Sequence, residues 1–129
     1  GNYSLAASYP LNDVGAQEVI YGNQRIKNIT FIHEVSGSSG TSQFDIKVFR
    51  SGSWQSIFTT LPAVTTTAAA GVVFDLVMAA PTGITKPVVG ASFFALADGE
   101  KLRFDILSTM SGSTKPDTIN IKIYCTQEN

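Results

Sequence analysis

The sequence predicts an all-β protein built from antiparallel sheets. Several segments alternate apolar and polar residues, as strands do when one face of their sheet is buried and the other meets water. Glycine- and serine-rich turn signals separate these segments at short intervals, and no segment has the caps and periodic apolar face of a helix. Many short strands joined in this way are typical of a β-sandwich or a β-barrel.

The expected strands follow one another along most of the chain, and residues 1–25 hold a lead-in segment together with the first strands. The strands are expected at residues 17–21, 26–35, 42–50, 72–78, 91–97, 102–106 and 118–126. Residues 63–70, rich in alanine and threonine, lack both caps and an apolar face, so we expect a loop there. The 129 residues fit one domain of ordinary size, and nothing marks a second one.

Three strands have clear core faces, because every second side chain is apolar and the residues between are polar. The residues expected in the core are Phe44, Ile46 and Val48, then Leu102, Phe104 and Ile106, and finally Ile119, Ile121, Ile123 and Cys125. The polar residues between them, including Asp45 and Asp105, are expected to face solvent.

Two other segments, Ile29–Ile32 and Val72–Phe74, blur this alternation with apolar residues at successive positions. Strands of this kind are often covered on both faces. One cover would be the second sheet, and a neighbouring subunit is a candidate for the other.

The composition excludes several classes of function. The formal net charge is −1, and the nine basic residues are scattered, so no cluster could neutralise a run of phosphates or bind a membrane surface. No apolar run approaches the roughly 20 residues of a transmembrane helix. One cysteine forbids a disulfide within the chain. The chain opens on Gly1 and not on Met, which we interpret as the mark of a cleaved tag or of an excised fragment of a longer protein.

A ligand site is sought first around Trp54, the only tryptophan, in the stretch FDIKVFRSGSWQSIFTT at residues 44–60. Sugar-binding surfaces use exposed aromatic rings with polar side chains nearby, and Arg50 and Gln55 flank this ring in the sequence. Tyr124 is expected on the polar side of the last strand. These four residues are the candidate ligand-binding residues. The alternative is that such rings are ordinary surface residues or pack between subunits.

Catalytic and metal-binding motifs are not predicted. His33 is the only histidine and has no orienting motif nearby, and Cys125 shares a face with three isoleucines, which predicts an inert thiol. Asp45 and Asp105 could be neighbours, but solvated strand residues are the ordinary interpretation. The segment from Asp98 to Glu100 lacks the alternating ligands of a calcium loop and is expected to be a turn. We therefore expect no catalytic residue, no metal and no cofactor.

Three phrases of the sequence, in this order, resemble a known family. They are SQFDIKVFRSGSWQSIFTTLPAV at residues 42–64, ALADGEKLRFDIL at 95–107 and KPDTINIKI at 115–123. Together they are similar to the jelly-roll-like domains near the C-terminal ends of phage tail fibres and of related trimeric bacterial surface fibres. The chain departs from that pattern at Arg50–Ser53, where an Asn-Gly turn is frequent, and at Glu100, where Asp is usual.

The resemblance implies an antiparallel jelly-roll sandwich that forms the homotrimeric tip of a fibre. It further implies a non-enzymatic role in adhesion, with a surface carbohydrate or another receptor as partner, and a location outside the cell, on a cell surface or on a virion. Two alternatives stay open. One is a monomeric carbohydrate-binding module of a secreted enzyme, and the other is a structural capsid or fibre domain without a ligand.

Overall fold

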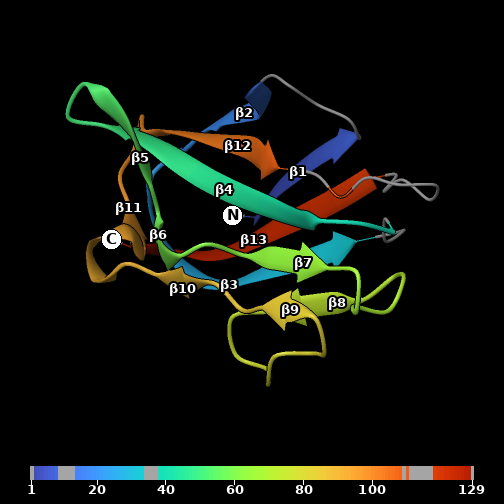
Figure 1. Cartoon of the computed structure of the whole chain (residues 1–129). Coiled ribbons are helices and arrows are strands. Elements are labelled where there is room, and N and C mark those ends of the chain that lie inside the picture. Colours follow the sequence, from blue (N-terminus) through green and yellow to red (C-terminus); the bar gives the residue numbers. More distant parts are fainter. Residues whose placement is uncertain (1, 9–13, 34–37, 109, 111–117, 129) are drawn as a thin grey trace.

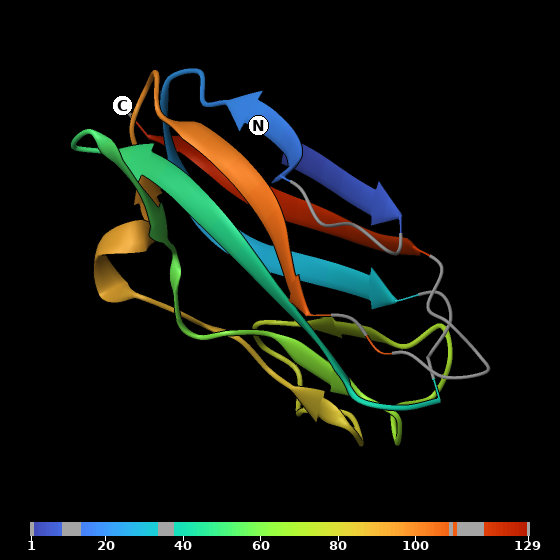
Figure 2. The ribbon, with the colours of Figure 1, turned by 45° about the horizontal axis from the view of Figure 1, so that its top comes forward.

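The computed structural model describes residues 2–8, 14–33, 38–108, 110 and 118–128, and these form two antiparallel sheets that pack face to face. Figure 1 shows the order of the strands, and Figure 2 shows the two layers, with β4 and β12 in one layer and β1, β3 and β13 in the other. The predicted all-β sandwich is confirmed.

The first layer is a five-stranded sheet around β13 (Thr118–Glu128), which lies between β1 (Asn2–Ser8) and β3 (Asn23–His33). The far side of β3 is shared by two short strands, β11 (Ala95–Leu96) near its start and β8 (Val73–Asp75) near its end.

The second layer is a six-stranded sheet around β12 (Lys101–Ser108) and β4 (Thr41–Arg50). Its other strands are β2 (Val14–Val19) beside β12, β5 (Ser53–Ser56) and β7 (Ala63–Thr65) beside β4, and β9 (Ile84–Thr85) beside β7. A separate ribbon pairs β6 (Phe58–Thr60) with β10 (Val88–Val89).

The order of pairing is nested. β13 joins β1 to β3 in one sheet, while β12 joins β2 to β4 in the other, so the chain alternates between the two layers from β1 to β4 and again from β11 to β13. This is the arrangement of a jelly roll, in which two sheets share a core and every neighbouring pair is antiparallel. The first 25 residues therefore belong to both sheets through β1 and β2.

The core contains the residues that the alternation selected. Phe44, Ile46 and Val48 are fully buried, and so are Leu102 and Phe104, whereas Ile106 is partly buried. On β13 the three isoleucines are fully buried and Cys125 is 9% exposed. Burial of each large apolar side chain contributes roughly 1.5–3 kcal/mol, so this shared interior holds the layers together.

Three sequence predictions need correction. Residues 91–97 are not one strand but a single 3₁₀ turn, η1 (Ala91–Phe93), followed by β11. The strand expected at 72–78 ends at Asp75, because this carboxylate accepts hydrogen bonds from the amides of Val77 and Met78 and closes a turn there. The loop expected at 63–70 begins as strand β7, which pairs with β4.

The β4–β5 hairpin decides the side on which Trp54 lies. Its two turn residues, Ser51 and Gly52, have φ of 54° and 81°, which suits the two-residue turn whose twist matches that of the strands. In this register Trp54 lies opposite Phe49, while Gln55 lies opposite the buried Val48. Trp54 therefore lies on the outer face of the six-stranded sheet and not in the core.

The segments with blurred alternation have two different faces. Ile29, Phe31 and Phe74 are fully buried, and the rings of Phe31 and Phe74 stack with centres 5.0 Å apart. Their neighbours Ile32 and Val73 lie opposite each other on the outer face of the five-stranded sheet, and Val73 is 45% exposed. Of the segments expected in a subunit contact, only these outward residues are free to make one.

Candidate functional site

The outer face of the six-stranded sheet carries an aromatic–cation stack formed by Phe49, Trp54, Lys101 and Arg103. The Trp54 and Phe49 rings meet edge to face with centres 5.3 Å apart. The Arg103 guanidinium lies 4.5 Å from the centre of the Trp54 ring, and the Lys101 ammonium lies 4.9 Å from that of Phe49. Each such contact contributes roughly 0.5–2 kcal/mol, so the protein's own cations already use these rings.

Asp105 continues the stack along β12. Both of its carboxylate oxygens accept hydrogen bonds from Arg103 at 2.9 Å, and the Lys47 ammonium lies 3.3 Å away. Directly opposite Asp105 in the register lies Asp45. The two carboxylates are therefore neighbours, as the sequence suggested.

Asp45 is not the solvated residue that the sequence predicted, because it is only 4% exposed. Its carboxylate accepts a hydrogen bond of 2.6 Å from the Ser56 hydroxyl. Burial raises the pKa of Asp45, and the negative charge of Asp105 adds to this, while the bond from Ser56 and the charge of Lys47 oppose it. The pair of carboxylates is thus engaged within the sheet and little of it meets solvent.

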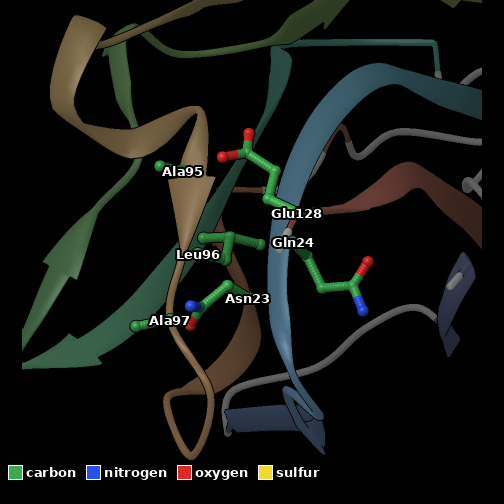
Figure 3. A pocket seen from close by; sticks show the side chains of 6 residues that line it. All are labelled: Asn23, Gln24, Ala95, Leu96, Ala97 and Glu128. Carbon is green, nitrogen blue, oxygen red and sulfur yellow. The ribbon is translucent and has the colours of Figure 1, made fainter.

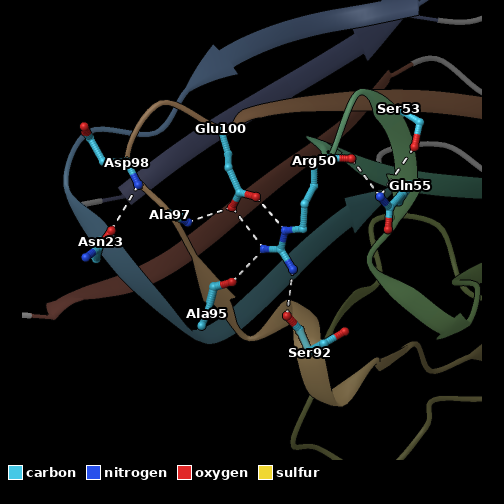
Figure 4. A network of polar contacts seen from close by, with 9 residues as sticks. All are labelled: Asn23, Arg50, Ser53, Gln55, Ser92, Ala95, Ala97, Asp98 and Glu100. Carbon is cyan, nitrogen blue, oxygen red and sulfur yellow. Dashed lines mark hydrogen bonds and ion pairs between the residues drawn. The ribbon is translucent and has the colours of Figure 1, made fainter.

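Arg50 is the centre of a polar network at one end of the sandwich (Figure 4). Its guanidinium donates to the Glu100 carboxylate at 2.5 and 3.0 Å, and to the carbonyls of Ser92 and Ala95 at 2.9 and 2.8 Å. Glu100 also accepts a bond from the amide of Ala97. Arg50 thereby joins β4 to η1, β11 and the turn before β12, which gives it a structural role.

The charges of this network stabilise each other. Burial alone would raise the pKa of Glu100, but the hydrogen bonds from Arg50 and from the Ala97 amide outweigh it, and the pKa is lowered. The hydrogen bond to Glu100 raises the pKa of Arg50. Only 12% of the Glu100 side chain and 25% of the Arg50 side chain are exposed. The two pKa shifts therefore keep the pair ionised although it is largely shielded from solvent.

The four predicted ligand residues do not form one site. Gln55 and Arg50 lie together on the hairpin, where the Gln55 amide donates to the Arg50 carbonyl at 2.8 Å (Figure 4). Trp54 lies on the outer face, within the stack. Tyr124 belongs to the other sheet, opposite Asn28 on its outer face, and is 36% exposed.

A polar hollow that the sequence did not suggest lies where β3, β11 and the end of β13 meet (Figure 3). It measures about 310 Å³ and is lined by Asn23, Gln24, Ala95, Leu96, Ala97 and Glu128. Asn23 and Glu128 are exposed and lie opposite each other in the register, so their side chains share the outer face of the sheet. Gln24 is 3% exposed and donates to the carbonyl of Tyr21.

Two further residues, Arg25 and Tyr21, lie close in the chain to Asn23 and Gln24 of the hollow. Arg25 follows on the same face of β3 and lies 3.9 Å from the Glu128 carboxylate, with about half of each side chain exposed. Tyr21, just before β3, is 75% exposed. The turn between them is fixed, since the Asp98 carboxylate accepts a bond from the Gly22 amide at 2.6 Å. The exposed groups are thus an aromatic ring, an amide, a guanidinium and a carboxylate.

The described part of the chain offers little material for metal binding or thiol chemistry. No group of three or more His, Cys, Asp and Glu side chains there is placed to hold a metal ion, and no helix there is long and apolar enough to cross a membrane. Burial raises the pKa of the Cys125 thiol to about 11, so very little of the reactive thiolate forms near neutral pH. His33 lies opposite Ile119, and its side chain is outside the described residues.

No protein-family model matches the chain, and no curated protein sequence matches it significantly.

Proposed function

We propose that the domain is a non-enzymatic recognition module that binds a surface carbohydrate at the polar hollow, as the tip of a homotrimeric fibre. The observation that carries this proposal is an open hollow of about 310 Å³ lined by the exposed side chains of Asn23 and Glu128. Arg25 lies beside Glu128, and the exposed Tyr21 comes two residues before Asn23 in the chain. A sugar offers an apolar ring face to an aromatic side chain, and its hydroxyls exchange hydrogen bonds with amides, carboxylates and guanidinium groups.

The shape of the hollow favours weak, multivalent binding. It is shallow, and its polar groups stand on paired strands, so little ordering of the protein is needed when a sugar binds. One such site per chain gives low affinity, but three sites on one tip raise the effective affinity by orders of magnitude. This mode of binding suits attachment to a surface that carries many copies of one glycan.

The outward residues Ile32 and Val73 support the trimeric part of the proposal. They form an apolar pair across β3 and β8 on an outer sheet face, where a lone monomer would leave them in water. A subunit contact that covers this pair would remove apolar area from solvent at roughly 25 cal/mol per Å².

The glycan proposal is tested by screening the protein on a glycan array and titrating the best hit. We expect Tyr21→Ala and Glu128→Gln each to weaken binding about tenfold, since each removes about one good contact. Tyr124→Ala is the matched control, because it removes an exposed tyrosine that does not line the hollow. If Trp54→Ala abolishes binding while Tyr21→Ala does not, the site lies at the hairpin and the hollow is the wrong place.

The assembly is tested by light scattering. A trimer is expected to have three times the mass of the 13.7 kDa chain, and Val73→Asp is expected to dissociate it. Leu107→Asp, at another exposed apolar residue, should leave the mass unchanged. A monomer that binds glycans would instead favour a carbohydrate-binding module, and a trimer without any array hit would favour a structural fibre domain.

A further inference from the structure

The five-stranded sheet is interrupted beside β3. β11 pairs with the start of this strand at Gln24 and Arg25, and β8 pairs with it again only from Thr30 onward. In the gap between β11 and β8, the Asn28 side chain makes hydrogen bonds where neither of these strands pairs with β3. Its carbonyl oxygen accepts hydrogen bonds from the amides of Ile29 and Leu76, and its nitrogen donates to Asp75. The break is therefore hydrogen-bonded and ordered.

An apolar groove of about 450 Å³ opens at this break, within the size range of small-molecule sites. It is lined by Lys27, Leu76, Val77, Lys86, Pro87, Val88, Val89 and Phe94. Val77 is 76% exposed and Val88 is 50% exposed. Aliphatic side chains held this far into solvent at the edge of a groove are favourable contacts for an apolar ligand.

The only ionisable groups that line the groove are two lysines. Lys27 is the extra residue of a β-bulge, because Tyr124 pairs with Asn28 and the next residue, Cys125, pairs with Ile26. β-Bulges change the direction of a side chain and are frequent next to active sites. Within the described residues Lys27 makes no hydrogen bond and no ion pair. The Lys86 ammonium donates to the carbonyl of Met78 at 2.9 Å, and its positive charge contributes to lowering the pKa of Asp75.

Other charges nearby are already engaged. One Asp75 oxygen accepts the amides of Val77 and Met78, and the other accepts from Asn28, which lowers the pKa of this carboxyl. Arg25 lies beside Glu128, and its guanidinium sits 5.9 Å from the centre of the Phe94 ring. Among the described residues that line the groove, the unmatched charge is therefore positive and belongs to Lys27, while Lys86 shares the charge of Asp75.

We propose that this groove binds a small aliphatic carboxylate, with the chain against Val77, Val88 and Phe94 and the carboxylate on the Lys27 ammonium. Charge complementarity selects this ligand, because an apolar lining alone would accept a neutral chain equally well. The site is separate from the polar hollow and does not depend on the proposed carbohydrate binding.

Calorimetric titration of the whole chain with octanoate tests the proposal, with 1-octanol as the neutral probe of the same length. Octanoate is expected to bind at least about fivefold more tightly than octanol, and Lys27→Gln is expected to remove this preference. The control is Lys122→Gln, which removes an exposed lysine on β13 and should leave octanoate binding unchanged. A second variant, Val88→Ser, should weaken both probes, since it removes apolar lining.

Three results would overturn the assignment. The first is no heat of octanoate binding at millimolar concentration, and the second is equal binding of octanoate and octanol. The third is a change in the mass of the protein in solution on Val88→Ser, because the groove would then be a contact between copies of the chain.

Discussion

The outer faces of the two sheets differ in how their side chains are used. On the six-stranded sheet the aromatic and charged residues contact one another, so that Arg103 alone joins Trp54 to Asp105. On the five-stranded sheet Val73 and Tyr124 are exposed, and Arg25 and Glu128 stand 3.9 Å apart with half of each side chain in water.

This difference shows that a residue which stands out in the sequence is not necessarily free to contact a ligand. Trp54 is the residue that attracts attention in the sequence, yet its ring is covered by an arginine. The five-stranded sheet carries less conspicuous residues, and both the polar hollow and the apolar groove open beside its strand β3. We therefore propose that a partner binds on that sheet, where Val73, Tyr124 and Glu128 remain exposed to solvent.

The largest difference between the faces is expected from removal of one arginine. Arg103→Ala should destabilise the protein by about 2 kcal/mol, because it removes two hydrogen bonds and a cation–π contact and leaves Asp105 opposite Asp45. Arg25→Ala, on the other sheet, should cost less than about 0.5 kcal/mol. Urea unfolding measures both, and equal losses would contradict the contrast between the faces.

A smaller change in the free energy of unfolding, of about 1 kcal/mol, is expected when the buried Asp45 of the six-stranded sheet is replaced by Asn. Its raised pKa means that folded Asp45 holds a proton more tightly than the unfolded chain does. Stability from this group is present below the ordinary carboxyl pKa and is lost as pH rises through the raised value. Asp45→Asn should therefore match the wild type in acid and exceed its stability at neutral pH. A variant that is less stable at neutral pH would show that the charge is favourable.

The smallest change in stability is expected for Asp75→Asn, and at neutral pH this variant should lose stability where Asp45→Asn gains it. The amides of Met78 and Val77 lower the pKa of Asp75, so its stabilisation is present above the ordinary carboxyl pKa and is lost as pH falls toward the lowered value. Asp75→Asn should be slightly less stable than the wild type at neutral pH and equal to it in acid. Unfolding curves over pH 2–7 check this, and an unchanged difference across that range would exclude the carboxylate as the cause.

The strands with one solvent-exposed face were predictable because the alternation of apolar and polar residues is visible within each strand. Alternation along β4, β12 and β13 places Phe44, Phe104 and Ile121 in the core without knowledge of their neighbours. The side of Trp54 was not predictable from alternation, since the short strand β5 has no apolar face of its own. Its register depends on the left-handed pair Ser51 and Gly52.

The candidate sites were beyond sequence reasoning for a different reason. Asn23 and Glu128 stand more than 100 positions apart in the chain, and the pairing of β3 with β13 brings them together. The burial of Asp45 likewise depends on a sheet face crowded by Lys47, Ser56 and Asp105. No local pattern reports such contacts, which follow from the order of the strands.

The central position of β13 also sets the order of events during folding. β1 precedes the other described strands in the chain, but its partner β13 lies more than 100 residues further along, and β3 also pairs with β13. Until β13 is made, both strands expose unpaired edges that invite contact with other chains. Completion of this sheet is therefore expected to be slow, and a high chain concentration during folding would promote aggregation.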